Sequence, residues 1–233
     1  TQRAENTYRA DFHCITLGPW LAKLLRERYS ATADHFDFAV ETGTYWPRRD
    51  LRVPSRVCFY ARPNTPRRAY EMGVAALELV KTRRPESEIV LFGADELTPP
   101  PRFPVTARGM LAAEELASLF SSCDVGVVLS LTNPSFVSLE MMACRCAVVE
   151  LASERFDGVL THGQDAWLVE ANAEAIAAGI ILLLEHDALR EKLIETAYRR
   201  ARAMDWRDSA RQIEAVLLRQ SATNAAPVAT ARK

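Results

Sequence analysis

Short apolar runs alternate along this chain with segments of helical periodicity. From residue 56 onward the runs rich in β-branched residues predict buried strands, at 57–60, 89–92, near Val105, and at 124–130, 147–151 and 166–169. Between and after them, apolar positions recur with the spacing of helices, at 67–83, 113–121, 136–144, 173–185 and 187–203. Strands separated by single helices predict an α/β fold, with a doubly wound, Rossmann-like parallel sheet.

The two ends of the chain lack the regular alternation of strands and helices seen in the middle. A strand at 12–17, a helix at 20–29 and a strand at 35–40 form a partial βαβ unit, followed by a proline-punctuated linker. Such a lone unit leaves an apolar face uncovered, so we expect it to dock on the main sheet, to pair between chains or to be mobile. A last helix is expected at 207–219, and the Ala-, Thr- and Ser-rich tail lacks an amphipathic period. The expected division is therefore 1–50, 51–219 and a disordered tail at 220–233.

Composition narrows the class of protein. Hydrophobic residues make up 48% of the chain, enough for a substantial core, and the net charge of −1 gives no basic footprint of a nucleic-acid binder. The longest apolar run, Ile180–Leu184, is too short to span a membrane, and no signal peptide opens the chain. The cysteines lack metal-ligand spacing and read as reduced thiols of a cytoplasmic protein, at positions 14, 58, 123, 144 and 146.

Candidate chemistry follows the predicted strands, because ligands of parallel sheets bind beyond the carboxyl ends of the strands. After the strand at 57–60, two prolines stiffen a loop that carries Arg62, Arg67 and Arg68. Guanidinium groups match diphosphate oxygens, and arginine at a helix start is unfavourable unless an anion binds there. A solvated helix start is the alternative.

The next loops add further candidates. Gly93 ends a strand where a ligand can approach closely, and Met110 follows a short strand, where apolar contact to a base is possible. Pro134-Ser135 opens a helix whose free N–H groups suit phosphate, and Glu140 lies further along it, within reach of ribose hydroxyls. Plain turns and an exposed helical acid are the alternatives.

Five segments in order carry a family resemblance. They are Phe59-Tyr-Ala-Arg62, Leu91-Phe-Gly93, Gly109-Met through Phe120, Asp124 to Ser130, and Pro134-Ser through Leu139-Glu-Met-Met-Ala143. Over residues 56–210 the chain resembles the C-terminal, donor-binding half of GT-B glycosyltransferases. It is most similar to the group-1, family 4-like retaining enzymes, in the rhamnosyltransferase branch of bacterial surface polysaccharide synthesis.

The resemblance implies roles for individual residues. Arg62 and Arg67 match the basic pair that neutralises the donor diphosphate, and Glu140 matches the second glutamate of a paired motif, which binds ribose. The first glutamate would stand at position 132, where this chain has Thr132, and Arg145 stands where the family commonly has glycine. The expected donor-binding residues are Gly93, Met110, Leu111, Thr132, Asn133, Ser135, Phe136, Val137 and Glu140.

The implied activity is transfer of a hexosyl or 6-deoxyhexosyl unit, such as rhamnosyl, from a dTDP- or UDP-linked sugar. No other cofactor is expected, and no metal, because the chain lacks an Asp-x-Asp cluster. The glycan acceptor would bind a missing N-terminal domain. The expected location is the cytoplasm, with peripheral association at the inner face of the membrane as an alternative. A non-catalytic nucleotide-sugar-binding module and an epimerase of GT-B architecture are the alternatives.

Overall fold

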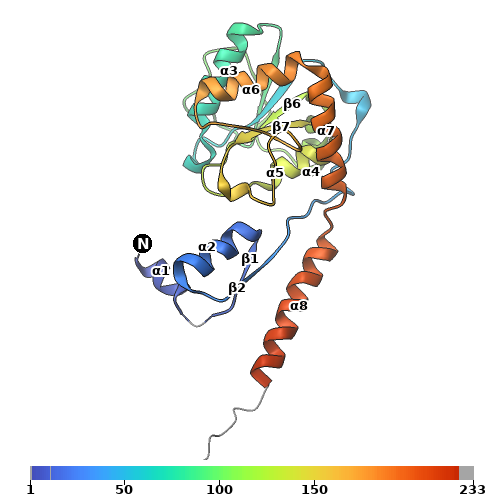
Figure 1. Cartoon of the computed structure of the whole chain (residues 1–233). Helices are drawn as coiled ribbons and strands as arrows, with labels where there is room; N and C mark the ends of the chain where they lie inside the picture. The colour runs from blue at the N-terminus through green and yellow to red at the C-terminus, as the bar shows by residue number, and fades with distance from the viewer. Residues whose placement is uncertain (1, 11, 226–233) are drawn as a thin grey trace, which may run out of the picture. The chain divides into compact units, whose positions relative to one another are not determined.

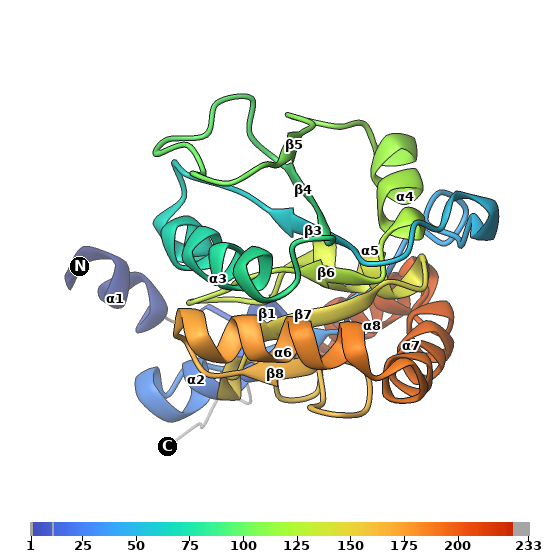
Figure 2. The ribbon, with the colours of Figure 1, turned by 90° about the horizontal axis from the view of Figure 1, so that it is seen from above.

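The computed structural model describes residues 2–10 and 12–225, which divide into two compact units (Figures 1 and 2). One unit is Val40–Met204, and the other combines the described residues of Thr1–Ala39 and Asp205–Lys233. Each unit has its own strands and its own apolar core.

The larger unit is built on a parallel sheet of order β5-β4-β3-β6-β7-β8. Its strands are β3 Arg56–Tyr60, β4 Glu88–Phe92, β5 Thr106–Ala107, β6 Val125–Val127, β7 Ala147–Leu151 and β8 Trp167–Val169. Neighbouring strands pair in parallel throughout, with Val57 opposite both Ile89 and Val125. This is the classic order of doubly wound sheets, so the predicted α/β fold class is confirmed.

Helices cover both faces of this sheet (Figure 2). They are α3 Tyr70–Arg83, α4 Ala113–Ser122, α5 Phe136–Ala143, α6 Ala173–Glu185 and α7 Asp187–Arg202, with single 3-10 turns at Arg49–Leu51, Pro66–Arg68 and Glu154–Phe156. Helices α3 and α6 pack side by side on one face, whereas α4 and α5 cover the other, and α7 lies against α5 (Figures 1 and 2). Phe59 of β3 and Leu77 of α3 are fully buried in one apolar cluster, so the β-branched strand runs lie in a continuous core.

The smaller unit contains the expected βαβ arrangement. Strands β1 Cys14–Leu17 and β2 Ala33–Phe36 pair in parallel on either side of α2 Pro19–Tyr29, after an unpredicted helix α1 Gln2–Tyr8. The second strand begins and ends earlier than its sequence pattern suggested.

The C-terminal helix α8, Trp206–Ala225, packs against β2 in this unit. Ser209 Oγ donates to the carbonyl oxygen of Asp37 at 2.9 Å, and Gln212 bonds both the backbone and the carboxylate of Asp37. The docking partner of the lone βαβ unit is therefore a helix from the other end of the chain. Residues 220–225 are helical, in contrast to the expected disorder, and 226–233 lie outside the described residues.

The helix end at Arg145 is left-handed, as its place in the pattern predicts. Arg145 has a φ of 62°, a conformation that costs a non-glycine residue roughly 1 kcal/mol. Its guanidinium pairs with Glu195 at 2.7 Å and with Glu191 at 3.5 Å. Arg145 therefore makes two ion pairs with α7 that a glycine at this position could not make.

Candidate functional site

The order of strands reverses between β3 and β6, and their following loops meet at this switch point. The backbone N–H of Leu131, after β6, donates to the carbonyl oxygen of Arg67, after β3, at 2.9 Å. Open parallel sheets bind ligands in the crevice at such a reversal. The loops after β3 and β6 therefore meet at the strand reversal, where the sequence predicts a ligand crevice.

The loop after β3 presents its arginines differently. Arg62 is half-buried, with its guanidinium 5.9 Å from the centre of the Tyr60 ring. Arg67 is exposed, whereas Arg68 turns inward and is only 7% exposed. Of the three arginines in this loop, Arg62 is therefore half-buried and Arg67 is exposed, whereas Arg68 is enclosed by the fold.

The loops after β4 and β5 are bonded to one another. Gly93 donates its N–H to the carbonyl oxygen of Gly109 at 2.8 Å, and Asp95 accepts the N–H of Met110 at 2.9 Å. Arg62, Gly93 and Met110 line one pocket of about 390 Å³, together with Pro63, Asn64, Ala94, Asp95 and Glu96. Three residues predicted from separate loops therefore share one cavity, and the side chain of Met110 is 59% exposed within reach of a ligand. Leu111 is half-buried and does not line it.

Ser135 caps the start of α5, as its sequence position predicts. Its backbone is extended, with a φ of −107°, and its hydroxyl accepts the N–H of Val137 at 3.4 Å. This arrangement holds Phe136 and Val137 in the first turn, where helix N–H groups suit an anion. Thr132 and Asn133 are exposed just before, and Thr132 Oγ1 donates to Asn133 Oδ1 at 2.9 Å.

Glu140 lies in the second turn of α5, partly buried and outside the 390 Å³ pocket. Burial raises the pKa of its carboxyl to about 7, and a hydrogen bond with the Tyr45 hydroxyl acts in the opposite direction. Tyr45 is itself buried, and burial raises the pKa of its phenol well above the usual value. The predicted ribose-binding carboxylate therefore already has a partner in the segment that precedes β3.

Sequence reasoning missed a buried set of hydrogen-bonded polar side chains. Glu150 is the last residue but one of β7 and is fully buried, and its carboxylate accepts the N–H and the hydroxyl of Ser130 at 2.8 and 3.0 Å. The Ser130 hydroxyl in turn accepts a hydrogen bond from Arg68. Burial raises the pKa of Glu150 to about 8, opposed by these hydrogen bonds and by the charge of Arg68. The available signal was a single acid inside the apolar run Ala147–Leu151.

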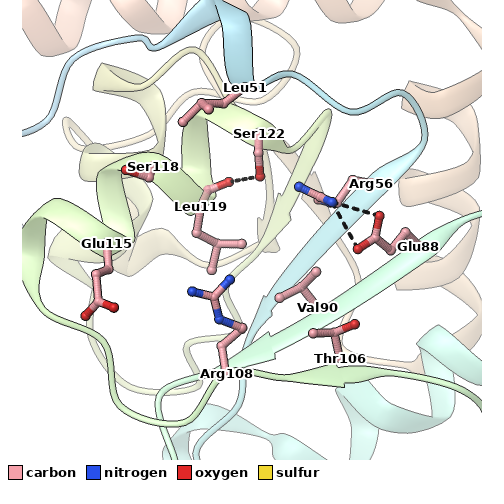
Figure 3. A pocket seen from close by; sticks show the side chains of 10 residues that line it. All are labelled: Leu51, Arg56, Glu88, Val90, Thr106, Arg108, Glu115, Ser118, Leu119 and Ser122. Atoms are coloured by element: carbon pink, nitrogen blue, oxygen red, sulfur yellow. Dashed lines mark hydrogen bonds and ion pairs between the residues drawn. The ribbon is translucent and has the colours of Figure 1, made fainter.

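A second pocket, of about 300 Å³, lies between β4, β5 and α4 (Figure 3). The Arg108 guanidinium points into it, near Leu119, and Arg56 pairs with both carboxylate oxygens of Glu88 at 3.1 and 2.9 Å. Arg108 thus lines this second pocket, whereas Met110, two residues later, lines the 390 Å³ pocket.

Thiols and metal ligands add no further centre among the described residues. The cysteines are free, and those at 58, 123, 144 and 146 are buried, whereas Cys14 is partly exposed. Within 2–10 and 12–225, no three His, Cys, Asp or Glu side chains are grouped to hold a metal ion. No helix in these ranges has the length and apolarity needed to cross a membrane.

Comparison with known proteins gives one family and several relatives. A family model described as "WsaF, C-terminal domain" matches residues 55–181. The O-antigen biosynthesis protein RfbC of Myxococcus xanthus is 34% identical over 97% of this chain and 18% of its own length. The phosphatidyl-myo-inositol mannosyltransferase of Mycobacterium tuberculosis is 32% identical over 70% of this chain and 46% of its own. The chain thus spans less than half the length of these relatives.

Solved structures agree on the fold. Sucrose-phosphate synthase from Thermosynechococcus elongatus has a TM-score of 0.80 at 20% identity, covering 96% of this chain and 63% of that one. HepE of Anabaena, solved with UDP and glucose, has a TM-score of 0.75 at 14% identity, covering 94% of this chain and 66% of that one. The predicted resemblance to GT-B glycosyltransferases is confirmed, and the chain belongs to the family of WsaF C-terminal domains.

Proposed function

We propose that this chain is the donor-binding part of a GT-B glycosyltransferase that acts on a nucleotide-diphosphate sugar. The observation that carries the proposal is the switch point between β3 and β6, where the Arg67 loop is bonded to Leu131, four residues before the Ser135 cap of α5. The names of the relatives support it, since one is a mannosyltransferase and another acts in O-antigen biosynthesis. HepE was solved with UDP, which favours a UDP- or dTDP-linked donor here.

The proposed chemistry is stabilisation of the departing diphosphate. Arg62 and Arg67 supply positive charge, and the first turn of α5 supplies N–H groups to phosphate oxygens. Such preorganised charge stabilises a developing anion without a metal ion. Glu140 accepts hydrogen bonds from ribose hydroxyls. We therefore propose metal-independent transfer, with retention of anomeric configuration as the family resemblance implies.

The proposal extends to the sugar and the acceptor. A hexosyl or 6-deoxyhexosyl unit, such as rhamnosyl, is compatible with a relative named for O-antigen biosynthesis. We propose that the glycan acceptor binds a part of the whole protein outside this chain, since the matched regions make up only 18% and 46% of the two relatives. We propose that the reaction takes place in the cytoplasm, with peripheral association at the inner face of the membrane.

Calorimetric titration of the chain with UDP, dTDP and GDP tests the proposal. Binding of one nucleotide is expected, and Glu140→Ala should weaken it by about tenfold or more, because loss of a hydrogen bond to a charged group costs about 1.5–3 kcal/mol. Glu214→Ala, which changes an exposed acid on α8, is the matched control and should bind as the unaltered chain does. Absence of binding to all three nucleotides would contradict the proposal. Loss of activity of the whole enzyme on addition of a chelator would contradict metal independence.

Thr132 favours a second candidate, a nucleotide-sugar-binding module without catalysis. In the resemblance, this position holds the glutamate that contacts the transferred sugar, whereas Thr132 is exposed and bonded to Asn133. An epimerase of the same architecture is the other candidate. Binding without turnover by the whole protein would identify the module, and isomerised free nucleotide sugar would identify the epimerase.

A further inference from the structure

Three arginines stand close together in residues 46–52, which form the basic segment of the larger unit. They are Arg48, Arg49 and Arg52, and Asp50 reduces the charge of the segment from +3 to +2. Together with Arg145, at the end of α5, these arginines line another pocket, of about 260 Å³. Its other lining residues are Pro47, Ser121, Cys144 and Glu191. Four arginines and one glutamate therefore give this pocket a positive charge.

The basic segment is held by hydrogen bonds to the ends of α4 and α5. The N–H of Arg48 donates to Ser121 Oγ at 3.1 Å. The Arg52 guanidinium donates to the carbonyl oxygens of Cys123 and Arg145, which follow these two helices. Because the segment is ordered without a ligand, an anion that binds there pays little for arranging it.

The acids near the pocket do not match all of its positive charge. Those paired with Arg48, Arg52 and Arg145 are Glu114, Asp124, Glu191 and Glu195. Of these acids only Glu191 lines the pocket. Arg49 is exposed and forms no ion pair within residues 2–10 and 12–225, and Arg48 Nη1 is buried without a hydrogen-bond partner in the same ranges. An anion in the pocket would therefore meet an arginine that has no carboxylate of its own.

Apolar side chains flank the pocket. Trp46 is 46% exposed, and its ring centre lies 4.8 Å from the Arg48 guanidinium. Leu51 is 38% exposed. Tryptophan is typical of the membrane–water interface, where its ring lies at the level of the headgroups, and arginine suits their phosphate oxygens. A small free anion would gain nothing from the apolar pair, which favours a phospholipid as the ligand.

We infer that the basic segment and Arg145 bind the phosphate headgroups of anionic phospholipids, with Trp46 at the lipid surface. The inference rests on the proposed peripheral association with the membrane and names the surface that makes it. The net charge of the chain is −1, so its attraction to an anionic surface has to come from a local cluster of positive charge. These residues are separate from the proposed donor-site residues, so lipid binding and nucleotide binding should be independent.

Co-sedimentation with vesicles tests the inference. The 233-residue chain should bind vesicles of mixed phosphatidylglycerol and phosphatidylcholine, and it should not bind vesicles of phosphatidylcholine alone. Binding should weaken when the salt concentration rises from about 0.1 M to about 1 M, because salt screens the attraction. Arg49→Gln should weaken it by about fivefold, the effect of one arginine near an anionic surface. Arg83→Gln, exposed at the end of α3, is the matched control and should bind as the unaltered chain does.

Tryptophan fluorescence locates the contact. Trp46 is one of four tryptophans, and the emission of the chain should shift to shorter wavelength when phosphatidylglycerol vesicles are added. Trp46→Phe keeps an aromatic ring at the interface, so it should still bind the vesicles but lose this shift. Trp46→Ala should lose affinity as well. Thermal unfolding of each variant shows whether it remains folded.

Three results would overturn the inference. The first is absence of binding to phosphatidylglycerol vesicles at low salt. The second is vesicle binding that Arg49→Gln and Trp46→Ala leave unchanged, which would keep the proposed peripheral association but exclude this surface from it. The third is binding of inorganic pyrophosphate that depends on Arg49 without any binding of vesicles, which would identify a site for a small free anion.

Nucleotide titration separates this inference from the proposed donor site. Arg49→Gln should bind the nucleotide with the affinity of the unaltered chain. If vesicle binding fails and a nucleotide binds, the donor site stands and the lipid site falls. If vesicles bind as expected and no nucleotide binds, the lipid site stands and the proposed donor site falls.

Discussion

Leu131 and Arg67 are joined by a backbone hydrogen bond of 2.9 Å, although the two residues lie in loops far apart in the sequence. The bond uses the carbonyl oxygen of Arg67 and leaves its exposed side chain free to meet a ligand. The carbonyl oxygen of Leu131 accepts a second hydrogen bond, from Arg155, at 2.6 Å. Both backbone groups of Leu131 are therefore hydrogen-bonded, to Arg67 and to Arg155, which holds the loop after β6 in place without a ligand.

Arg67→Ala should separate binding from folding. The substitution removes the guanidinium but keeps the carbonyl group that holds Leu131, so the melting temperature should change little. Affinity for the nucleotide diphosphate should fall by about tenfold or more, because hydrogen bonds to charged groups contribute about 1.5–3 kcal/mol. Titration calorimetry and thermal unfolding measure the two effects. An unchanged affinity would remove Arg67 from the donor site.

Gly93→Ala should damage both the fold and the pocket. Gly93 has a φ of +101°, and an added Cβ would lie 2.7 Å from Cε2 of the Tyr60 ring. Overpacking of this kind costs about 1–3 kcal/mol, and moving Tyr60 would also shift Arg62, whose guanidinium lies near its ring. Urea unfolding should show the loss of stability. Gly163→Ala, with open space around its Cβ and a φ of +70°, controls for the backbone strain alone.

The parts of the fold set by local pattern were predicted well. Strand β7 and helix α6 have the predicted bounds, Ala147–Leu151 and Ala173–Glu185. One is a continuous apolar run, and the other begins after Asn172, whose side chain accepts the N–H of Ala175 at 2.7 Å. The carboxyl ends of the predicted strands then placed Arg62, Gly93 and Met110 at one pocket.

What the sequence did not reveal depends on contacts between distant segments. Helix α8 covers β2 of the smaller unit, and the pairing of the two chain ends leaves no periodic signal. Arg67 and Arg68 are adjacent in the chain, but only the three-dimensional turn shows that one is exposed and the other buried. Tyr45 was assigned to a linker, and its hydrogen bond to Glu140 required knowledge of where that linker runs.

Removal of α8 should unfold the smaller unit and spare the larger one. Truncation after Met204 deletes the bonds of Ser209 and Gln212 to Asp37, and the ion pair of Arg219 with Asp34. A two-stranded unit of this size cannot bury enough apolar surface alone. Hydrogen exchange should therefore show lost amide protection in β1 and β2 but not in β3 or β7. Truncation after Ala225, which keeps α8, should preserve protection everywhere, and protection of β1 in the shorter chain would contradict the expectation.

The raised pKa of Glu140 should appear as a pH dependence of stability. An unfolded glutamate has a pKa near 4.5, whereas burial raises that of native Glu140 to about 7. Between these values the native state holds the proton that the unfolded chain releases, so the free energy of unfolding should fall as the pH rises through this window, by at most about 1.4 kcal/mol per pH unit. Below the window both states are protonated, and above it both are ionised, so the contribution is constant there.

Glu140→Gln should lack this part of the slope, and its stability relative to the unaltered protein should be greater at pH 8 than at pH 5 in urea unfolding. Tyr45→Phe removes the hydrogen bond that opposes the rise in the Glu140 pKa, so it should extend the pH window of falling stability to higher pH. Equal slopes of unfolding free energy against pH in all three proteins would show that Glu140 does not titrate in this range.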